Sequence, residues 1–224
     1  MPVLTVLVPA NNEAESVDEL IVRTATAFKL LGLSGELIFI DDGSTDDTAA
    51  RVQRWLPDAP WLRLLQHPRN LGLSAALQSG FEAAASEYIL FLPADLQSHP
   101  DEDIPKLYHA LQQGLDVVAG WRQGRRGRKR LAAALYNAGS RWFFHVPVHD
   151  ANWIKGFRRE VVAGFPPLRP GWHRFLLHIA VAQGWRIGEI PTRWYPRQAG
   201  RSHYGVGRMP RALRDAWQIY RSQF

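Results

Sequence analysis

Short apolar runs alternate with amphipathic segments through the first 120 residues. The runs are four to seven residues long and predict strands over 4–9, 36–42, 61–66, 88–93 and 116–119. Between them, apolar positions recur at helical spacing over 13–31, 74–85 and 101–113, and a further helix is expected with Ser44 or Thr45 as its cap. Because strands and helices alternate and the strand segments are almost wholly apolar, the pattern predicts a single α/β domain with a mainly parallel sheet flanked by helices.

Amide and carboxylate side chains follow three of the predicted strands; they are Asn11, Asn12, Glu13, Asp41, Asp42 and Asp95. Ligands of parallel α/β sheets bind at the carboxyl ends of the strands. Carboxylate oxygens suit Mg²⁺ or Mn²⁺, which bridge phosphates, so these residues predict a site for a cation or a hydroxyl-rich ligand. A solvated loop surface would account for any one of them alone. Neither Gly-x-x-x-x-Gly-Lys nor Gly-x-Gly-x-x-Gly is present, which disfavours nucleotide hydrolases and dehydrogenases.

The net charge of +6 is unevenly divided along the 224 residues. Residues 1–120 hold 7 basic and 17 acidic side chains, a net charge of −10. Residues 121–224 hold 20 basic and 4 acidic side chains, a net charge of +16, together with seven of the nine tryptophans. Such asymmetry indicates two kinds of partner. The basic half is less regular: we expect a loop over 122–130, a helix over 131–144 and a strand over 187–190.

Composition excludes several protein classes. A hydrophobic content of 46% allows a sizeable core and excludes a disordered or fibrous chain. The absence of cysteine excludes disulfides, thiolate metal sites and cysteine nucleophiles, and it fits a cytosolic compartment. No apolar run approaches the roughly 18–20 residues of a membrane span, and the N-terminal residues lack the charged region of a signal peptide. We therefore expect a soluble or peripheral protein.

Four segments stand at the strand ends: VPANNEAESV at 8–17, IDDGSTDDT at 40–48, NLGLSAALQSGF at 70–81 and LPADLQSHPDEDIP at 92–105. In order and spacing they resemble the signatures of family 2 inverting glycosyltransferases. The most similar branch is that of the dolichol- or polyprenol-phosphate mannosyl- and glucosyltransferases. The resemblance implies a nucleotide-sugar-binding domain of the glycosyltransferase-A type, Rossmann-like, over 1–205. We expect an acidic nucleotide-sugar and metal half (1–120), a basic acceptor half (121–205), and an amphipathic C-terminal helix (206–224) that lies on a membrane or docks on the domain.

For the donor, the resemblance implies nucleotide-sugar contacts at Pro9, Asn11, Glu13, Ile40, Asp42 and Asp95. It also implies Mg²⁺ or Mn²⁺ held by Asp95, Gln97 and the donor diphosphate. Two positions depart from the family pattern. Asn11 stands where the family has an aromatic residue that stacks on the base, and Pro93 replaces the first aspartate of the Asp-x-Asp-x-Gln motif. Because proline has no ligating side chain, we expect a weaker metal site.

In the basic half, DANWIKGFRREV from Asp150 is similar to the family segment in which an aspartate precedes a Phe-Arg strand. The resemblance implies that Asp150 and Asp95 are catalytic, and a turn residue is the alternative for Asp150. It further implies contacts to the acceptor or its phosphate at Arg122, Lys129, Arg130, Arg197, Ser202 and His203. His203 stands where the family has a permanent cation.

Charge pattern and resemblance together predict an enzyme that moves a hexose from a nucleotide sugar, of the GDP-mannose or UDP-glucose type, to a polyprenyl or dolichyl phosphate. We expect it at the cytoplasmic face of the membrane. A lipid phosphate is already anionic, so it needs guanidinium groups more than a base, and tryptophans favour the membrane interface. One alternative is a saccharide or other hydroxyl acceptor with Asp150 as general base. A basic nucleic-acid-binding module is the other; no nucleic-acid motif supports it, and the acidic half would repel the polymer.

Overall fold

The strands that the structure describes form one seven-stranded sheet in the order β3-β2-β1-β4-β6-β5-β7. The computed structural model describes residues 2–124, 142 and 145–197. The strands are β1 (Leu4–Ala10), β2 (Gly35–Asp41), β3 (Leu62–Gln66), β4 (Tyr88–Phe91), β5 (Val117–Gln123), β6 (Lys155–Arg158) and β7 (Ile187–Arg193). β6 is antiparallel to β4 and β5, and all other neighbours are parallel. The predicted mainly parallel α/β sheet is therefore confirmed.

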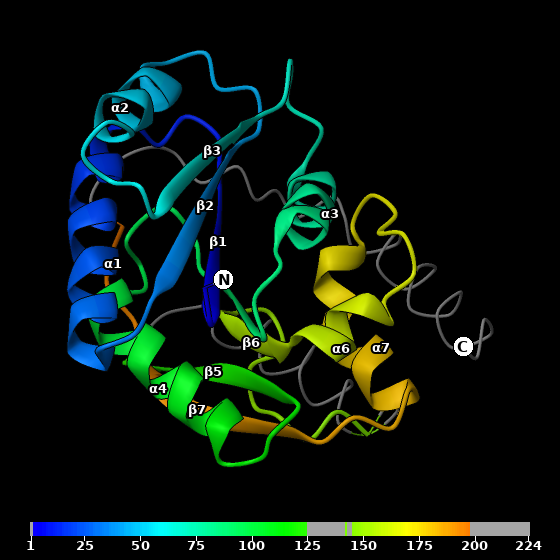
Figure 1. The fold of residues 1–224 in the computed structure, drawn as a ribbon. Helices are drawn as coiled ribbons and strands as arrows, with labels where there is room; N and C mark the ends of the chain where they lie inside the picture. The colour runs from blue at the N-terminus through cyan, green and yellow to red at the C-terminus, as the bar shows by residue number, and fades with distance from the viewer. Residues whose placement is uncertain (1, 125–141, 143–144, 198–224) are drawn as a thin grey trace.

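Helices cover both faces of the sheet (Figure 1). One face carries α1 (Val17–Leu31), α2 (Thr48–Trp55) and α4 (Pro100–Gln112); the other carries α3 (Leu73–Ala83), α6 (Arg159–Ala163) and α7 (Leu176–Ala182). Two short 3₁₀ turns, Ala14–Ser16 and Trp172–Phe175, complete the described elements. In β2, Leu37 and Phe39 join the core on one face while Ile38 and Ile40 join the core on the other. Burial on both faces is why the strand reads as an unbroken apolar run.

The antiparallel direction of β6 decides where the site lies. The carboxyl ends of β1, β2, β4 and β5 meet at one edge of the sheet, and the segment that enters β6 begins at that same edge. Asp150 therefore reaches the edge that also carries Glu13 and Asp95. Pro9 lies beyond the last pair of β1 with β4, Leu7↔Phe91, so its missing N–H removes no hydrogen bond from that ladder.

Among the predicted boundaries that differ from the structure, those of β5 and α2 bear on the site. β5 extends to Gln123, beyond the predicted 116–119, and this brings Arg122 to the end of a strand. α2 begins at Thr48, so the expectation that Ser44 or Thr45 caps it is wrong. Ser44 and Thr45 are hydrogen-bonded to Asn12, and Asp46 Oδ1 instead accepts the Thr48 backbone N–H at 3.0 Å.

Several predicted elements lie outside the described residues: most of the basic loop, the helix over 131–144 and the C-terminal helix over 206–224. The division into 1–205 and 206–224 stays a prediction. None of the helices in the described part of the chain has the length and apolar character needed to cross a bilayer.

Candidate active site

The loops that follow β1 and β2 are joined by hydrogen bonds into one surface. Asn12 has a φ of 58°, in the left-handed region that asparagine tolerates better than most residues. Its Oδ1 accepts the Thr45 backbone N–H at 2.8 Å, and its own N–H donates to Ser44 Oγ at 2.9 Å. Asn11 Nδ2 donates to the Asp42 carbonyl at 2.9 Å. Asn11 therefore supports the loop geometry from the position where the family has a stacking aromatic.

Asp42 is hydrogen-bonded to the loop that precedes α3. Its side-chain oxygens accept the backbone N–H groups of Leu71 at 2.9 Å and Gly72 at 2.7 Å, and His67 Nδ1 lies 2.8 Å from Oδ1. His67 Nε2 lies 3.0 Å from Ser79 Oγ on α3. Asp42 is only 5% exposed. His67 was not among the predicted site residues, since a lone histidine is more often a surface or core residue than a catalyst. The structure shows that its partners, Asp42 and Ser79, lie in two other segments.

Ile40 is not at the site surface. Its side chain is fully buried in the core beneath α3, in the cluster that includes Leu7 and Leu77. The implied contact between Ile40 and the nucleotide sugar is therefore not supplied by its side chain in this structure. The cause is strand alternation, which turns Ile40 into the sheet face covered by α3.

Glu13, Asp95 and Arg197 meet at the edge of the sheet. An Arg197 guanidinium nitrogen donates to Glu13 Oε1, and Arg197 Nε lies 4.0 Å from Asp95 Oδ2. Burial raises the pKa of Glu13, the Arg197 charge opposes this shift, and the Asp95 charge adds to it. The sequence placed Arg197 with the acceptor phosphate, and the structure places it between two carboxylates of the predicted donor side.

The metal motif is short of free ligands in the observed arrangement. Asp95 Oδ1 accepts the Gln97 backbone N–H at 3.2 Å, and Gln97 Nε2 donates to Asp95 Oδ2. Gln97 Oε1 accepts the Trp194 indole N–H at 2.8 Å, which occupies one of the two lone pairs of the amide oxygen that would bind a cation. No cluster of three or more metal-ligating side chains occurs within the ranges 2–124 and 145–197. Asp95 is the one carboxylate of the motif, so the described side chains alone supply too few ligands for a complete Mg²⁺ or Mn²⁺ shell, and the donor diphosphate would have to supply further oxygens.

On the acceptor side, Arg122 holds Asp150 with two hydrogen bonds. Arg122 Nε lies 2.5 Å from Asp150 Oδ2 and the Nη2 nitrogen lies 2.8 Å from Oδ1. The guanidinium carbon stands 4.7 Å from the centre of a Trp153 ring, and Trp153 Nε1 donates to Thr192 Oγ1 on β7 at 3.1 Å. Asp150 is 7% exposed. This is the bidentate geometry that gives Arg–carboxylate pairs their strength and orientation. The structure thus joins two predicted residues, while Lys129, Arg130, Ser202 and His203 lie outside the described residues.

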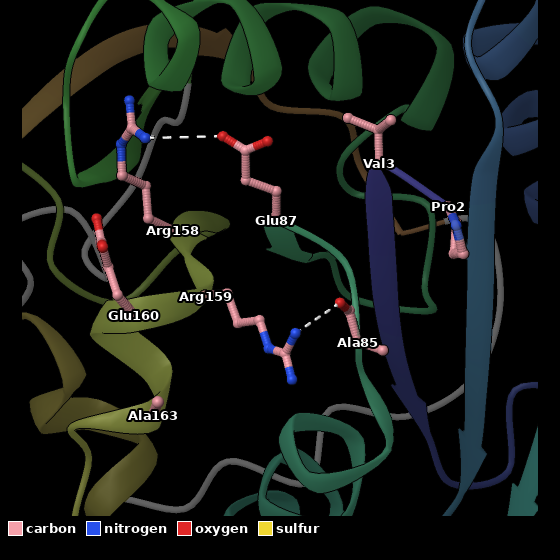
Figure 2. Close-up of a pocket in the computed structure, with 8 residues that line it drawn as sticks. All are labelled: Pro2, Val3, Ala85, Glu87, Arg158, Arg159, Glu160 and Ala163. Carbon is pink, nitrogen blue, oxygen red and sulfur yellow. Dashed lines mark hydrogen bonds and ion pairs between the residues drawn. The ribbon is translucent and has the colours of Figure 1, made fainter.

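A separate cavity of about 600 Å³ lies at the opposite, amino-terminal edge of the parallel strands. Figure 2 shows Arg158 paired with Glu87 and Arg159 directed to the Ala85 carbonyl. Arg158 also donates to the carbonyls of Leu111 and Leu115 at 3.3 Å each. Because these cations already have acceptors, the cavity carries no argument for a ligand.

Comparison with known proteins decides the family. A family model described as Glycosyl transferase family 2 matches residues 5–165. The chain belongs to glycosyl transferase family 2. A dodecaprenyl-phosphate galacturonate synthase of Rhizobium johnstonii is 32% identical over 225 residues, which cover 96% of this chain and 66% of the relative. An undecaprenyl-phosphate 4-deoxy-4-formamido-L-arabinose transferase of Edwardsiella ictaluri is 30% identical over 217 residues, which cover 95% of this chain and 66% of the relative. This family 2 chain thus spans slightly less than two thirds of these relatives.

A solved structure supports the fold of this family 2 chain. Glucosyl-3-phosphoglycerate synthase from Mycobacterium tuberculosis, in complex with Mn²⁺, uridine diphosphate and glucosyl-3-phosphoglycerate, matches with a TM-score of 0.72. The match covers 99% of this chain and 80% of that chain at 19% sequence identity. At this identity the likeness shows the fold alone, and it agrees with the predicted glycosyltransferase-A type.

Proposed function

We propose that the chain transfers a hexose from a nucleotide sugar, of the GDP-mannose or UDP-glucose type, to a polyprenyl or dolichyl phosphate. The observation that carries this proposal is the Arg122–Asp150 pair. Both oxygens of Asp150 accept hydrogen bonds from one guanidinium, so the carboxylate is poorly placed to take a proton. A phosphate acceptor needs no proton removed, whereas a sugar hydroxyl needs a general base. The names of the two relatives, both polyprenyl-phosphate sugar transferases, agree with this choice.

In the proposed reaction, an oxygen of the lipid phosphate attacks the anomeric carbon from the face opposite the leaving group. The bond from that carbon to the nucleoside diphosphate breaks with its electron pair, and a sugar–phosphate diester forms. Charge grows on the departing diphosphate, so cations nearby stabilise the transition state. Arg197 is the cation that the described residues place at the donor edge, beside Glu13 and Asp95.

On the donor side, the proposal uses the joined loops after β1 and β2. Pro9, Asn11 and Glu13 would form its floor, with Asp42 fixing the loop before α3. Mg²⁺ or Mn²⁺ stays a prediction from the family resemblance, and Asp95, Gln97 and the donor diphosphate would hold it. A bound divalent ion would supply positive charge to the diphosphate.

We place the reaction at a membrane surface, on the cytoplasmic face. Trp121 and Trp142, both in the basic half, are 38% and 77% exposed, and Trp121 stacks on His149 at 4.4 Å between ring centres. Exposed tryptophans with abundant cations suit the interface of an anionic bilayer. This arrangement supports a lipid acceptor over a soluble saccharide, and the family favours an enzyme over a nucleic-acid-binding module.

A donor panel tests the proposal. GDP-mannose, UDP-glucose and UDP-galacturonate are each incubated with the chain and undecaprenyl phosphate in detergent micelles, with undecaprenol as the control lipid that lacks phosphate. We expect one donor to release its nucleoside diphosphate only when the phosphorylated lipid is present. Release that is equal with undecaprenol would favour the hydroxyl-acceptor alternative, and no release with any donor would contradict the proposal.

A further inference from the structure

Lys155 is a buried lysine that the proposed mechanism leaves unexplained. It opens β6, pairs with Phe91 of β4 and Ala119 of β5, and is 2% exposed. Its Nζ donates to the Trp153 carbonyl at 2.7 Å and lies 5.8 Å from the centre of the Phe91 ring. An ammonium has three N–H donors, and within the described residues this is its one hydrogen bond. A buried charge is costly unless it is paired and hydrogen-bonded.

The charges around Lys155 do not balance. Arg122 of β5 and Asp150 of the segment before β6 both act on its ammonium, and among the described residues His178 of α7 is the other titratable group that interacts with it. Burial, and then the Lys155 charge, lower the pKa of His178 to about 4, so this ring is neutral at pH 7. Phe91 of β4 contributes a ring face and no charge. Within the part of the chain that the structure describes, two cations thus face one carboxylate, and that carboxylate already accepts two hydrogen bonds from Arg122.

We propose that Lys155 is a positioning residue of the acceptor site: its ammonium holds the Trp153 carbonyl, the Trp153 ring packs on Arg122, and the phosphate of the acceptor supplies the negative charge that this group of cations lacks. The inference rests on the proposed function. Lys155 is too buried to reach a lipid phosphate directly, so it acts through the Arg122–Asp150 pair. Because the Asp150 charge acts on both the Lys155 ammonium and Arg122, one carboxylate does not neutralise both cations, and the remaining positive charge attracts an incoming anion.

The protonation of Lys155 gives this arrangement a measurable signature. Burial lowers the pKa of Lys155 to about 7, the Arg122 charge adds to the shift, and the Asp150 charge opposes it. Near neutral pH the Lys155 amine is thus only partly protonated in the free protein. An anion that binds nearby favours the charged form, so binding of the acceptor should be accompanied by proton uptake.

Calorimetry of the full chain with farnesyl phosphate at pH 7, in two buffers of different ionisation enthalpy, tests the proposal. We expect the wild type to take up about half a proton more per bound ligand than Lys155→Arg, which stays charged. The ionisation of the ligand's own phosphate is common to both proteins and cancels in the difference. Equal proton counts would overturn the inference.

Lys155→Met provides a second variant in case arginine disturbs folding, and uridine diphosphate binding together with thermal unfolding checks its integrity. We expect at least a tenfold rise in the KM for farnesyl phosphate with the donor KM unchanged, while the exposed control Lys29→Met changes neither.

The wild-type kcat/KM for farnesyl phosphate should fall as pH rises above about 7, and Lys155→Arg should lack this fall. An unchanged acceptor KM in Lys155→Met would overturn the inference. If the wild type binds nucleotide but no prenyl phosphate at all, the proposed acceptor fails, and this inference fails with it.

Discussion

At the residue scale, the geometry of Asp150 and Arg122 supports the proposed phosphate acceptor over a hydroxyl acceptor. A general base has to offer a free oxygen to the attacking hydroxyl, and its removal costs about 10²–10⁴ in rate. In this chain both oxygens of Asp150 are bound by Arg122, and Trp153 packs on the guanidinium. Asp150 is therefore better suited to orienting a cation than to accepting a proton.

Replacing Asp150 by asparagine tests this assignment. Asparagine keeps one oxygen acceptor for Arg122 but removes the charge, so we expect kcat/KM for the lipid phosphate to fall about tenfold, the order of one charge-assisted hydrogen bond. Glu160→Gln, an exposed carboxylate on α6, is the matched control and should leave kcat/KM unchanged. A loss beyond a hundredfold in Asp150→Asn, with the fold intact, would instead identify a general base.

A second prediction at the residue scale concerns Pro93 and the effect of Mn²⁺ on nucleotide binding. Because Gln97 Oε1 is bound to Trp194 and Pro93 offers no ligand, we expect uridine diphosphate affinity of the wild type to change less than about threefold between EDTA and Mn²⁺. Pro93→Asp restores a carboxylate and should make the affinity rise at least about tenfold with Mn²⁺. Calorimetry measures both, and Pro57→Asp in an exposed turn is the control. Strong Mn²⁺ dependence in the wild type would show that Asp95 and the diphosphate suffice.

At the scale of elements, α4 carries a buried acid in its first turn. Asp103 is 1% exposed, accepts the Ser98 hydroxyl at 2.6 Å, and has no hydrogen-bond partner for Oδ1 among the described residues. Burial raises its pKa to about 6 against the Ser98 hydrogen bond and the Lys106 charge. A folded-state pKa above the unfolded value means that the protonated form stabilises the fold, and that this stability is lost as pH rises through about 6.

Urea unfolding of Asp103→Asn against the wild type between pH 4 and 7 checks this sign. Asparagine does not titrate, so the variant should gain stability relative to the wild type as pH rises, by up to about 3 kcal/mol. His178 acts in the opposite direction over part of this range, but it is present in both proteins and cancels in the difference. Parallel stability curves would contradict the assigned pKa.

The elements also show what the sequence could and could not predict. β1, β2 and β4 are buried on both faces, so their unbroken apolar runs predicted the strands to within two residues. β6 was implied only by the family resemblance, because Lys155 and Gly156 interrupt its apolar pattern, and the short helices α6 and α7 were not predicted. Their existence depends on packing against the sheet, which a local pattern does not record.

For the site, the position of Glu13 and Asp95 at strand ends indicated that they lie near each other, because parallel strands end at a common edge. The sequence could not predict contacts between segments that lie far apart along the chain. The Trp194–Gln97 hydrogen bond and the Arg197 contacts with Glu13 and Asp95 join segments about a hundred or more positions apart. Neither a motif nor a charge count specifies such pairs.

At the scale of the whole molecule, residues of the acidic half and of the basic half lie along the same edge of the sheet. The acidic half supplies the joined loops after β1 and β2 and the Asp95 segment, and the basic half supplies Arg122, Lys155 and Arg197. Because β6 runs antiparallel, the segment carrying Asp150 enters at that same edge. The fold therefore places a proposed donor site and a proposed anionic acceptor site side by side on one domain.

Product analysis tests this account most directly. With the active donor and undecaprenyl phosphate, the product is isolated and its mass and anomeric configuration are determined. The account predicts a sugar joined to the lipid through a single phosphodiester, with the anomeric configuration inverted relative to the donor. A product in which the sugar is attached to a hydroxyl group, or one with retained configuration, would contradict it.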